Sequence, residues 1–155
     1  MKLFSEVPQS VLREIRYVFT DIDDTLTDNG SLRASAYSAI EALDNAGIGV
    51  VPITGRPAGW CDLIARFWPV RGVVGENGAF YFRYQRQETR MERFYADSKS
   101  QRQEKQKKLA ELATKIIEKV PSCAVSADQA YRETCLLYTS PSPRDYAASR
   151  MPSSA

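Results

Sequence analysis

The stretch "YVFTDIDDTLTDNG" (residues 17–30) decides the fold of this chain. It opens with "YVFTD", a run of apolar and β-favouring residues with no breaker, which predicts a buried strand. Three carboxylates, Asp21, Asp23 and Asp24, follow where this strand ends, and the Asn-Gly pair at 29–30 is a turn signal. Carboxylates this close repel one another, so we expect a cation to offset the repulsion, together with a phosphate group that the cation would bind.

The next part of the chain alternates helices and strands. A helix is predicted over 32–47, where Gly47 is a stop signal, and another over 58–68. Strands are predicted over 48–55 and 72–78, and the first of these lacks polar alternation. Strand–helix–strand–helix–strand with crossovers of this length predicts an α/β fold with a doubly wound parallel sheet.

Polar residues lie at the carboxyl end of each predicted strand. They are Asp21, Thr54, Glu76 and Asn77. Ligands of such sheets bind at the carboxyl ends of the strands, beside a topological switch point. We therefore expect these residues to share one site.

The pattern changes after the third strand. A hairpin is predicted over 79–96, a long amphipathic helix over 98–120 and a further strand over 123–128. We predict a first domain over 1–84 and the start of a second, smaller unit over 85–134.

The stretch "CLLYTSPSPRDYAASRMPSSA" (135–155) is rich in Ser and Pro and has no period. Its simplest interpretation is a disordered tail. Back-translation of the same stretch resembles the adapter used in sequencing library preparation. We therefore expect the native sequence to end near Thr134 and the remainder to be adapter read-through, which the source DNA would test.

Composition excludes several functions. The chain has 155 residues, is 43% hydrophobic, and carries a net charge of +2, which does not favour nucleic acid as a partner. No apolar run is long enough to span a membrane, and no signal peptide is evident, so we expect a cytoplasmic protein; its oligomeric state is left open. The absence of histidine excludes Ser-His-Asp and Cys-His nucleophiles and the usual zinc sites. The three cysteines have no metal-ligand spacing and are interpreted as free thiols.

Two carboxylates two residues apart can divide the work of phosphoryl transfer. Asp21 can attack the phosphorus while Asp23 handles protons. Mg²⁺ suits a site of carboxylate and carbonyl oxygens. Taken alone, the Asp-x-Asp pattern is also compatible with an acidic capping turn.

The motif is not alone, because "VFTDIDDTLTDNG", "VPITGRP" and "GVVGENGA" occur in this order. In this arrangement the sequence resembles the haloacid dehalogenase superfamily of phosphohydrolases over roughly residues 16–134. The resemblance implies that Asp21 is the nucleophile and a Mg²⁺ ligand. It implies that Asp23 is the general acid/base and lends its backbone carbonyl to the metal. It also implies that Thr54 and the Gly55 N–H bind the transferring phosphoryl group.

The place of the second unit extends the resemblance to subfamily IIB, whose α+β cap follows the third strand. This subfamily includes sucrose-phosphate, trehalose-phosphate and mannosylphosphoglycerate phosphatases and phosphomannomutases, so a phosphorylated sugar is the expected substrate. Arg56, Glu76 and Asn77 are interpreted as contacts to the substrate. The alternatives are a surface arginine paired with an acid, for Arg56, and a polar turn, for the other two.

Two family elements are missing from the chain: a core lysine and a second acidic pair. The lysines between 99 and 119 lie on the predicted cap helix and are interpreted as solvated. We therefore expect this chain to bind Mg²⁺ poorly and to turn over little phosphate ester.

Three alternatives remain. The first is a phosphomutase of the same superfamily. The second is a non-catalytic phosphoacceptor such as a receiver domain, although the third strand offers Glu76 where such domains carry the phosphorylated Asp. The third is a degenerate fragment whose sheet has an unpaired edge and marginal stability.

Overall fold

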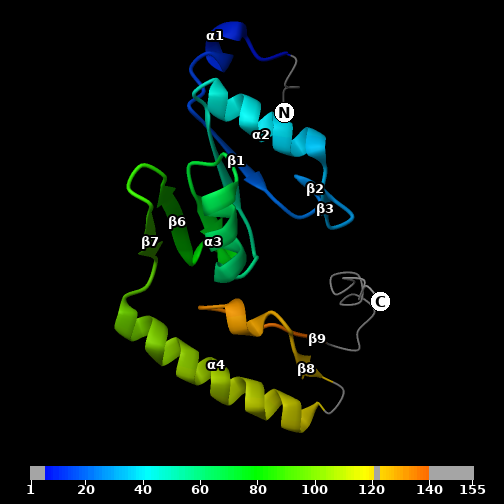
Figure 1. The fold of residues 1–155 in the computed structure, drawn as a ribbon. Coiled ribbons are helices and arrows are strands. Elements are labelled where there is room, and N and C mark those ends of the chain that lie inside the picture. The colour runs from blue at the N-terminus through cyan, green and yellow to red at the C-terminus, as the bar shows by residue number, and fades with distance from the viewer. Residues whose placement is uncertain (1–5, 121–122, 140–155) are drawn as a thin grey trace.

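The computed structural model describes residues 6–120 and 123–139. Figure 1 shows the order of the elements along the chain. In the first part these are α1 (Gln9–Leu12), β1 (Tyr17–Asp21), β2 (Thr27–Asp28), β3 (Ser31–Leu32), α2 (Ala34–Asn45), β4 (Gly49–Ile53), α3 (Ala58–Phe67), β5 (Val73–Gly75) and the 3₁₀ turn η2 (Glu76–Gly78). They continue with β6 (Phe80–Gln85), β7 (Arg90–Tyr95), α4 (Lys99–Lys119), β8 (Ala124–Val125), the 3₁₀ turn η3 (Gln129–Tyr131) and β9 (Tyr138–Thr139).

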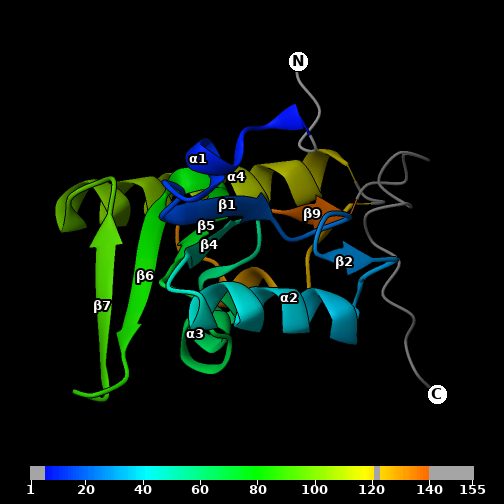
Figure 2. The same cartoon turned by 90° about the horizontal axis from the view of Figure 1, so that it is seen from above.

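The main sheet has five strands in the order β1-β4-β5-β6-β7. The first three are parallel, and β6 and β7 are antiparallel additions. Asp21 pairs with Ile53, and Ile53 with Val74, so the carboxyl ends of the three parallel strands meet at one edge. Helices α2 and α3 lie on one face of this sheet (Figure 2). The predicted α/β fold class is thereby confirmed.

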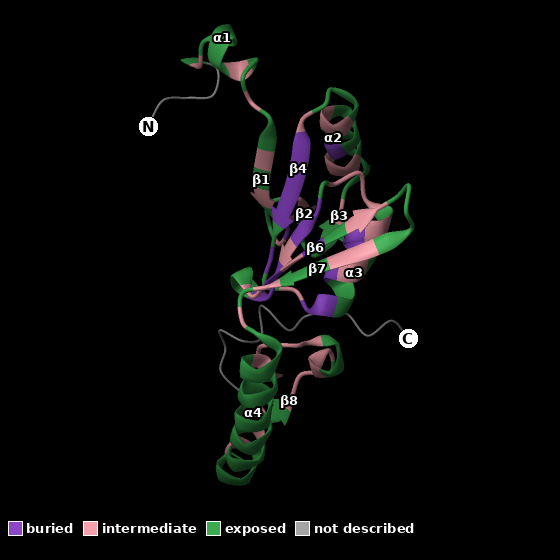
Figure 3. Ribbon diagram, turned by 90° about the vertical axis from the view of Figure 1, so that its left-hand side faces the viewer, coloured by how far each residue is buried: buried purple, intermediate pink, exposed green. Residues whose placement is uncertain are grey.

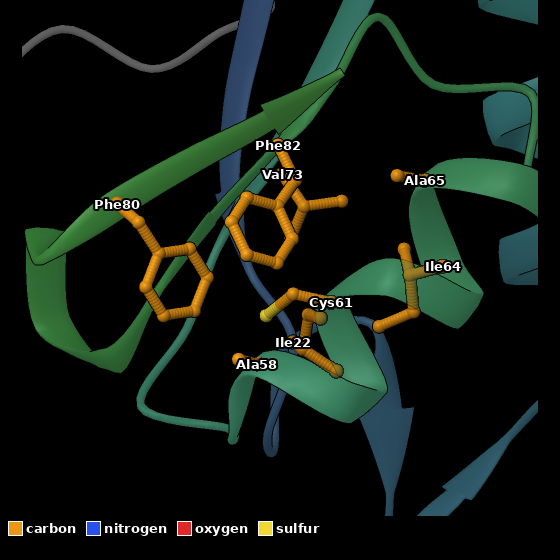
Figure 4. Close-up of a cluster of buried hydrophobic side chains, with 8 residues drawn as sticks. All are labelled: Ile22, Ala58, Cys61, Ile64, Ala65, Val73, Phe80 and Phe82. Atoms are coloured by element: carbon orange, nitrogen blue, oxygen red, sulfur yellow. The ribbon is translucent and has the colours of Figure 1, made fainter. Parts of the chain in front are cut away.

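The face of the sheet towards α3 holds the core. Strand residues alternate between the two faces, so Val73, Phe80 and Phe82 point the same way, towards Cys61 and Ile64 of α3 (Figure 4). The buried positions of α3 recur every three to four residues, which is the period of one helix face. The predicted helix over 58–68 thus forms because its apolar stripe covers the sheet.

The opposite face of the sheet is open among the described residues. Tyr17 and Phe19 of β1, Ile53 of β4 and Phe94 of β7 share this face by register, and all four are exposed. Figure 3 shows the contrast between buried β4 and the more exposed β1 at its side. In the described part of the chain, β1 also pairs on one side only. The expected unpaired edge is therefore present there, together with an apolar face.

Local sequence signals set two boundaries as predicted. Gly47 has φ +79° and follows α2, and the N–H groups of Gly47 and Ile48 donate to the carbonyls of Asp44 and Leu43. This is the Schellman ending, which needs a left-handed residue that glycine supplies without strain. The pair at 29–30, with positive φ at both residues, turns the β2–β3 hairpin as an Asn-Gly turn does.

The β6–β7 hairpin spans the predicted domain boundary between residues 84 and 85, and the division into two units stays a prediction. That boundary falls inside β6, and β6 pairs with β7 along its length, from Phe80–Tyr95 to Gln85–Arg90. Because β6 also pairs with β5, the whole hairpin extends the main sheet. The part of the chain from α4 onward is called the second unit below, and α4 starts with a capping box that joins Ser98 and Gln101.

The predicted disordered segment begins at Cys135, but residues 135–139 have defined partners. The Ser126 N–H donates to the Leu137 carbonyl, and β9 pairs with β8 as a short antiparallel ladder. The backbone groups of this segment thus find partners before residue 140. The rest of the predicted tail, 140–155, lies outside the described residues.

Among the helices described, none combines the length and the hydropathy that a membrane span requires.

Candidate active site

The ends of three parallel strands form one pocket of about 470 Å³. Its lining contains most of the residues that the sequence singles out. These are Asp21, Asp23, Thr54, Gly55 and Asn77, with Phe19, Thr20 and Ile53 beside them. Residues up to 56 positions apart, from Asp21 to Asn77, come together because β1, β4 and β5 end at the same edge. Arg56 and Glu76 are not part of this lining.

The loop after β1 is organised around the backbone of Ile22. The Ile22 carbonyl accepts from the N–H groups of Leu26 and Thr27, at 3.0 and 2.9 Å, and from the Thr27 hydroxyl at 3.1 Å. The Ile22 side chain is buried in the core, and its N–H donates to Asp21 Oδ1 at 2.7 Å. Because Ile22 is anchored in this way, the neighbouring residues Asp21 and Asp23 have fixed backbone positions.

The loop after β4 holds a buried threonine. Thr54 is 2% exposed. Its N–H donates to the Val74 carbonyl at 2.9 Å, and its carbonyl accepts from the Asn77 N–H at 3.1 Å. Thr54 Oγ1 accepts from the Arg56 N–H at 3.1 Å, so the hydroxyl keeps its own proton for a further acceptor. A Cβ at Gly55 would lie 3.2 Å from Asn77 Oδ1, so the absence of a side chain there lets Asn77 approach.

Arg56 pairs with Asp23. Nε lies 3.2 and 3.1 Å from the two carboxylate oxygens of Asp23, and Nη2 lies 2.5 Å from Oδ1. Its guanidinium also stacks over the ring of Trp60, 4.6 Å from the centroid. Of the two roles considered for Arg56, this placement is that of an arginine paired with an acid.

Glu76 is placed differently from the expectation of a substrate contact. It is 5% exposed, and its carboxylate accepts from the N–H groups of Ala58, Glu133 and Thr134 and from the Thr134 hydroxyl. One of these donors is the first residue of α3, where a negative charge is favourable. Glu76 therefore joins α3 to the second unit.

A further contact reaches the site from the second unit and has no signal in the sequence. Arg132 Nη1 donates to the Gly55 carbonyl at 3.1 Å, across 77 positions of sequence. Asp128 holds the same guanidinium through Nη2 at 2.8 Å, and this pairing raises the pKa of Arg132 against the effect of burial. A pairing so distant is decided by the packing of the second unit, so sequence spacing could not have shown it.

The donor set at the pocket fits Mg²⁺. Asp21 and Asp23 supply carboxylate and carbonyl oxygens, and Mg²⁺ is usually held by one or two carboxylates, several waters and a substrate phosphate. Among residues 6–120 and 123–139, no group of three His, Cys, Asp or Glu residues is placed to hold a metal. No lysine lines the pocket; the lysines of the described ranges all lie on α4.

The nearest buried thiol is no nucleophile. Cys61 is fully buried on α3, and burial, together with the negative charge of Glu76, raises its pKa to about 12. At neutral pH it is therefore a protonated core residue.

The strand order and the acidic pocket define the class, an α/β protein with a ligand site at the carboxyl edge of its sheet. Residues 18–147 match the family described as haloacid dehalogenase-like hydrolase. The chain belongs to this family, which confirms the superfamily expected from the three motifs. The matched range passes Thr134, and the origin of residues 135–155 stays a prediction.

Solved structures agree with this fold. Thermoplasma acidophilum protein 0175 superposes with a TM-score of 0.64 and 19% identity, over 86% of this chain and 55% of that one. A hypothetical protein from Geobacillus kaustophilus HTA426 gives a TM-score of 0.50 and 19% identity, over 82% of this chain and 44% of that one. The chain thus spans about half the length of these structures, and at this identity the likeness shows the fold alone. No curated protein matches the sequence.

Proposed function

We propose that the site is that of a Mg²⁺-dependent phosphohydrolase that works through an aspartyl-phosphate. The observation that carries the proposal is the shared pocket of Asp21, Asp23, Thr54 and Gly55 at the carboxyl ends of β1 and β4. Family membership supports the reaction class.

The proposed reaction has two steps. An Asp21 oxygen forms a bond to phosphorus as the bond to the ester oxygen breaks, and Asp23 gives that oxygen a proton. Asp23 then takes a proton from a water that attacks the phosphorus, which releases inorganic phosphate and restores Asp21. Mg²⁺, when bound by Asp21 and the Asp23 carbonyl, supplies positive charge that offsets the charge on the phosphoryl oxygens.

The other pocket residues position the phosphoryl group. Thr54 is buried and its hydroxyl has a proton to donate, and the Gly55 N–H is beside it. Fixed donors of this kind stabilise developing charge without a reorganisation cost. Asn77, against Gly55, is a substrate contact in the same proposal.

We propose a small phosphorylated metabolite, and among these a sugar phosphate, as the substrate. The support is the resemblance of the motif order and cap position to subfamily IIB, with the cap as the part that would select the substrate. For this chain by itself we expect weak Mg²⁺ binding and little turnover, because no lysine lines the pocket to balance the charge of nucleophile and phosphate.

The test is a phosphate-release screen over sugar phosphates, with Mg²⁺ and with chelator, on the chain and on any extension of its reading frame found in the source DNA. Release should require Mg²⁺ and fall by at least about 10³-fold in Asp21→Asn, because the nucleophile is lost.

The matched control is Asp28→Asn, since Asp28 is an exposed aspartate paired with Arg33 on the β2–β3 hairpin. Its release should equal that of the unaltered chain. Equal release by Asp21→Asn would contradict the nucleophile assignment. Formation of an isomeric sugar phosphate without net release would favour the mutase instead.

A further inference from the structure

We propose that Arg56 is a positioning residue, which holds the Asp23 carboxylate in place and does not bind substrate. The inference rests on the proposed function for the role of Asp23. The clasp itself, made of Asp23, Arg56 and Trp60, can be tested without turnover.

Three bonds define the clasp. Arg56 uses Nε and Nη2, two adjacent donors of one edge of the guanidinium, on Asp23 at 2.5–3.2 Å. A planar fork that meets a carboxylate in this way fixes both the position and the plane of the carboxylate. Lysine, a single point charge, would fix neither.

The flat face of Arg56 is held as well. The Trp60 ring lies 4.6 Å from the guanidinium carbon, and a cation above an indole ring is attracted to its face. Trp60 is on the first turn of α3, whose buried face is anchored in the core. The ring thus projects from an anchored helix and offers the guanidinium an apolar face, although Trp60 itself is 39% exposed.

Arg56 joins all three loops of the site through its backbone and its side chain together. Its N–H donates to Thr54 Oγ1 at 3.1 Å, and its carbonyl accepts from the Glu76 N–H at 3.3 Å. Arg56 thus connects the loops after β4 and β5 by its backbone, and the loop after β1 by its side chain. Because these bonds hold Arg56 in place, its side chain in turn restricts the position of the Asp23 carboxylate.

The placement argues against substrate binding. Arg56 does not line the pocket, whereas Asp23 does. The Nε–Nη2 edge of the guanidinium is occupied by Asp23. The pair also offsets part of the repulsion among the three carboxylates after β1.

The first test uses NMR on the whole chain to measure the hydrogen-exchange rate of the Arg56 Nε–H. We expect slow exchange, accelerated at least about tenfold in Asp23→Asn, since hydrogen bonds to charged groups contribute more than neutral ones. The matched control is Arg66, which meets Asp62 through Nε and Nη2 and stacks 4.8 Å over Tyr84. The Arg66 Nε–H should exchange faster in Asp62→Asn and at an unchanged rate in Asp23→Asn. Unchanged Arg56 exchange in Asp23→Asn would overturn the proposal.

The second test separates positioning from substrate binding by kinetics. Arg56→Lys should lower kcat about tenfold and leave KM within about twofold, because only the orientation of the acid/base is lost. Arg66→Lys should leave both constants unchanged. A raised KM at constant kcat would show that Arg56 binds substrate and would overturn the proposal. If no variant releases phosphate in an Asp21-dependent way, the proposed function fails, and the exchange test alone decides the role of Arg56.

Discussion

The fold strongly alters the ionisation of the Cys61 thiol. Burial, reinforced by Glu76, raises the pKa of the thiol from 9.0 to about 12. Between these pH values the unfolded chain releases a proton that the folded chain keeps. The contribution of Cys61 to the free energy of unfolding is therefore fully present below pH 9 and is lost as the pH rises towards 12. Over three pH units the loss attributable to Cys61 is on the order of 4 kcal/mol at most.

The measurement is urea unfolding at several pH values between 8 and 11, for the unaltered chain and for Cys61→Ala. Tyr81 and Tyr95, whose pKa values burial also raises, contribute equally to both proteins. The difference in free energy of unfolding should therefore shrink with rising pH. A difference that stays constant would contradict the assignment to the Cys61 thiol.

At the scale of elements, the β6–β7 hairpin has one buried and one open face. Phe82 is 1% exposed and packs beneath α3, whereas Phe94 is 56% exposed on the open face. Phe82→Ala should cost about 3–5 kcal/mol of stability through lost packing and a cavity. Phe94→Ala should cost less than about 1 kcal/mol, as surface substitutions usually do.

Chemical denaturation of both variants checks this prediction, and each serves as the control of the other because both lie on the same hairpin. Equal losses would mean that the open face is covered in solution. A small loss in Phe82→Ala alone would mean that α3 does not pack on the hairpin as described.

The hairpin also shows where sequence patterns reach their limit. Alternation of aromatic and polar residues predicted two strands correctly, because the two-residue period of side chains is visible within each strand's own sequence. Alternation does not say which other strand lies beside the pair. The pairing of β6 with β5 therefore had to come from the fold.

At the scale of the whole molecule, Glu76 joins the sheet, α3 and the second unit. Its buried carboxylate accepts four hydrogen bonds, three of them from Glu133 and Thr134 of the second unit. Glu76→Gln replaces one acceptor oxygen by an NH₂ group that faces N–H donors. We expect a loss of about 2–3 kcal/mol, the usual cost of buried polar groups left without partners.

Hydrogen exchange locates the effect. The amides of Glu133 and Thr134 should exchange faster in Glu76→Gln, along with a lower midpoint of urea unfolding. Glu88→Gln is the matched control, since Glu88 is exposed in the turn between β6 and β7. Unchanged exchange at Glu133 and Thr134 would show that the second unit is held in another way.

The sequence by itself determined the alternation of strands and helices, the turn at 29–30, the stop at Gly47 and the set of polar residues at the strand ends. All of these depend on neighbours a few positions apart, because period, capping and turn chemistry are local. It also sufficed to recognise the superfamily, since the motifs keep their order along the chain.

Only the tertiary structure decided which of those polar residues face the pocket. The lining includes Asp21, Asp23, Thr54, Gly55 and Asn77. Arg56 instead pairs with Asp23, and the Glu76 carboxylate accepts hydrogen bonds from the second unit. The physical reason is competition for partners. A charged side chain pairs with whichever donors and acceptors the packed chain places beside it, and these come from residues far away in sequence.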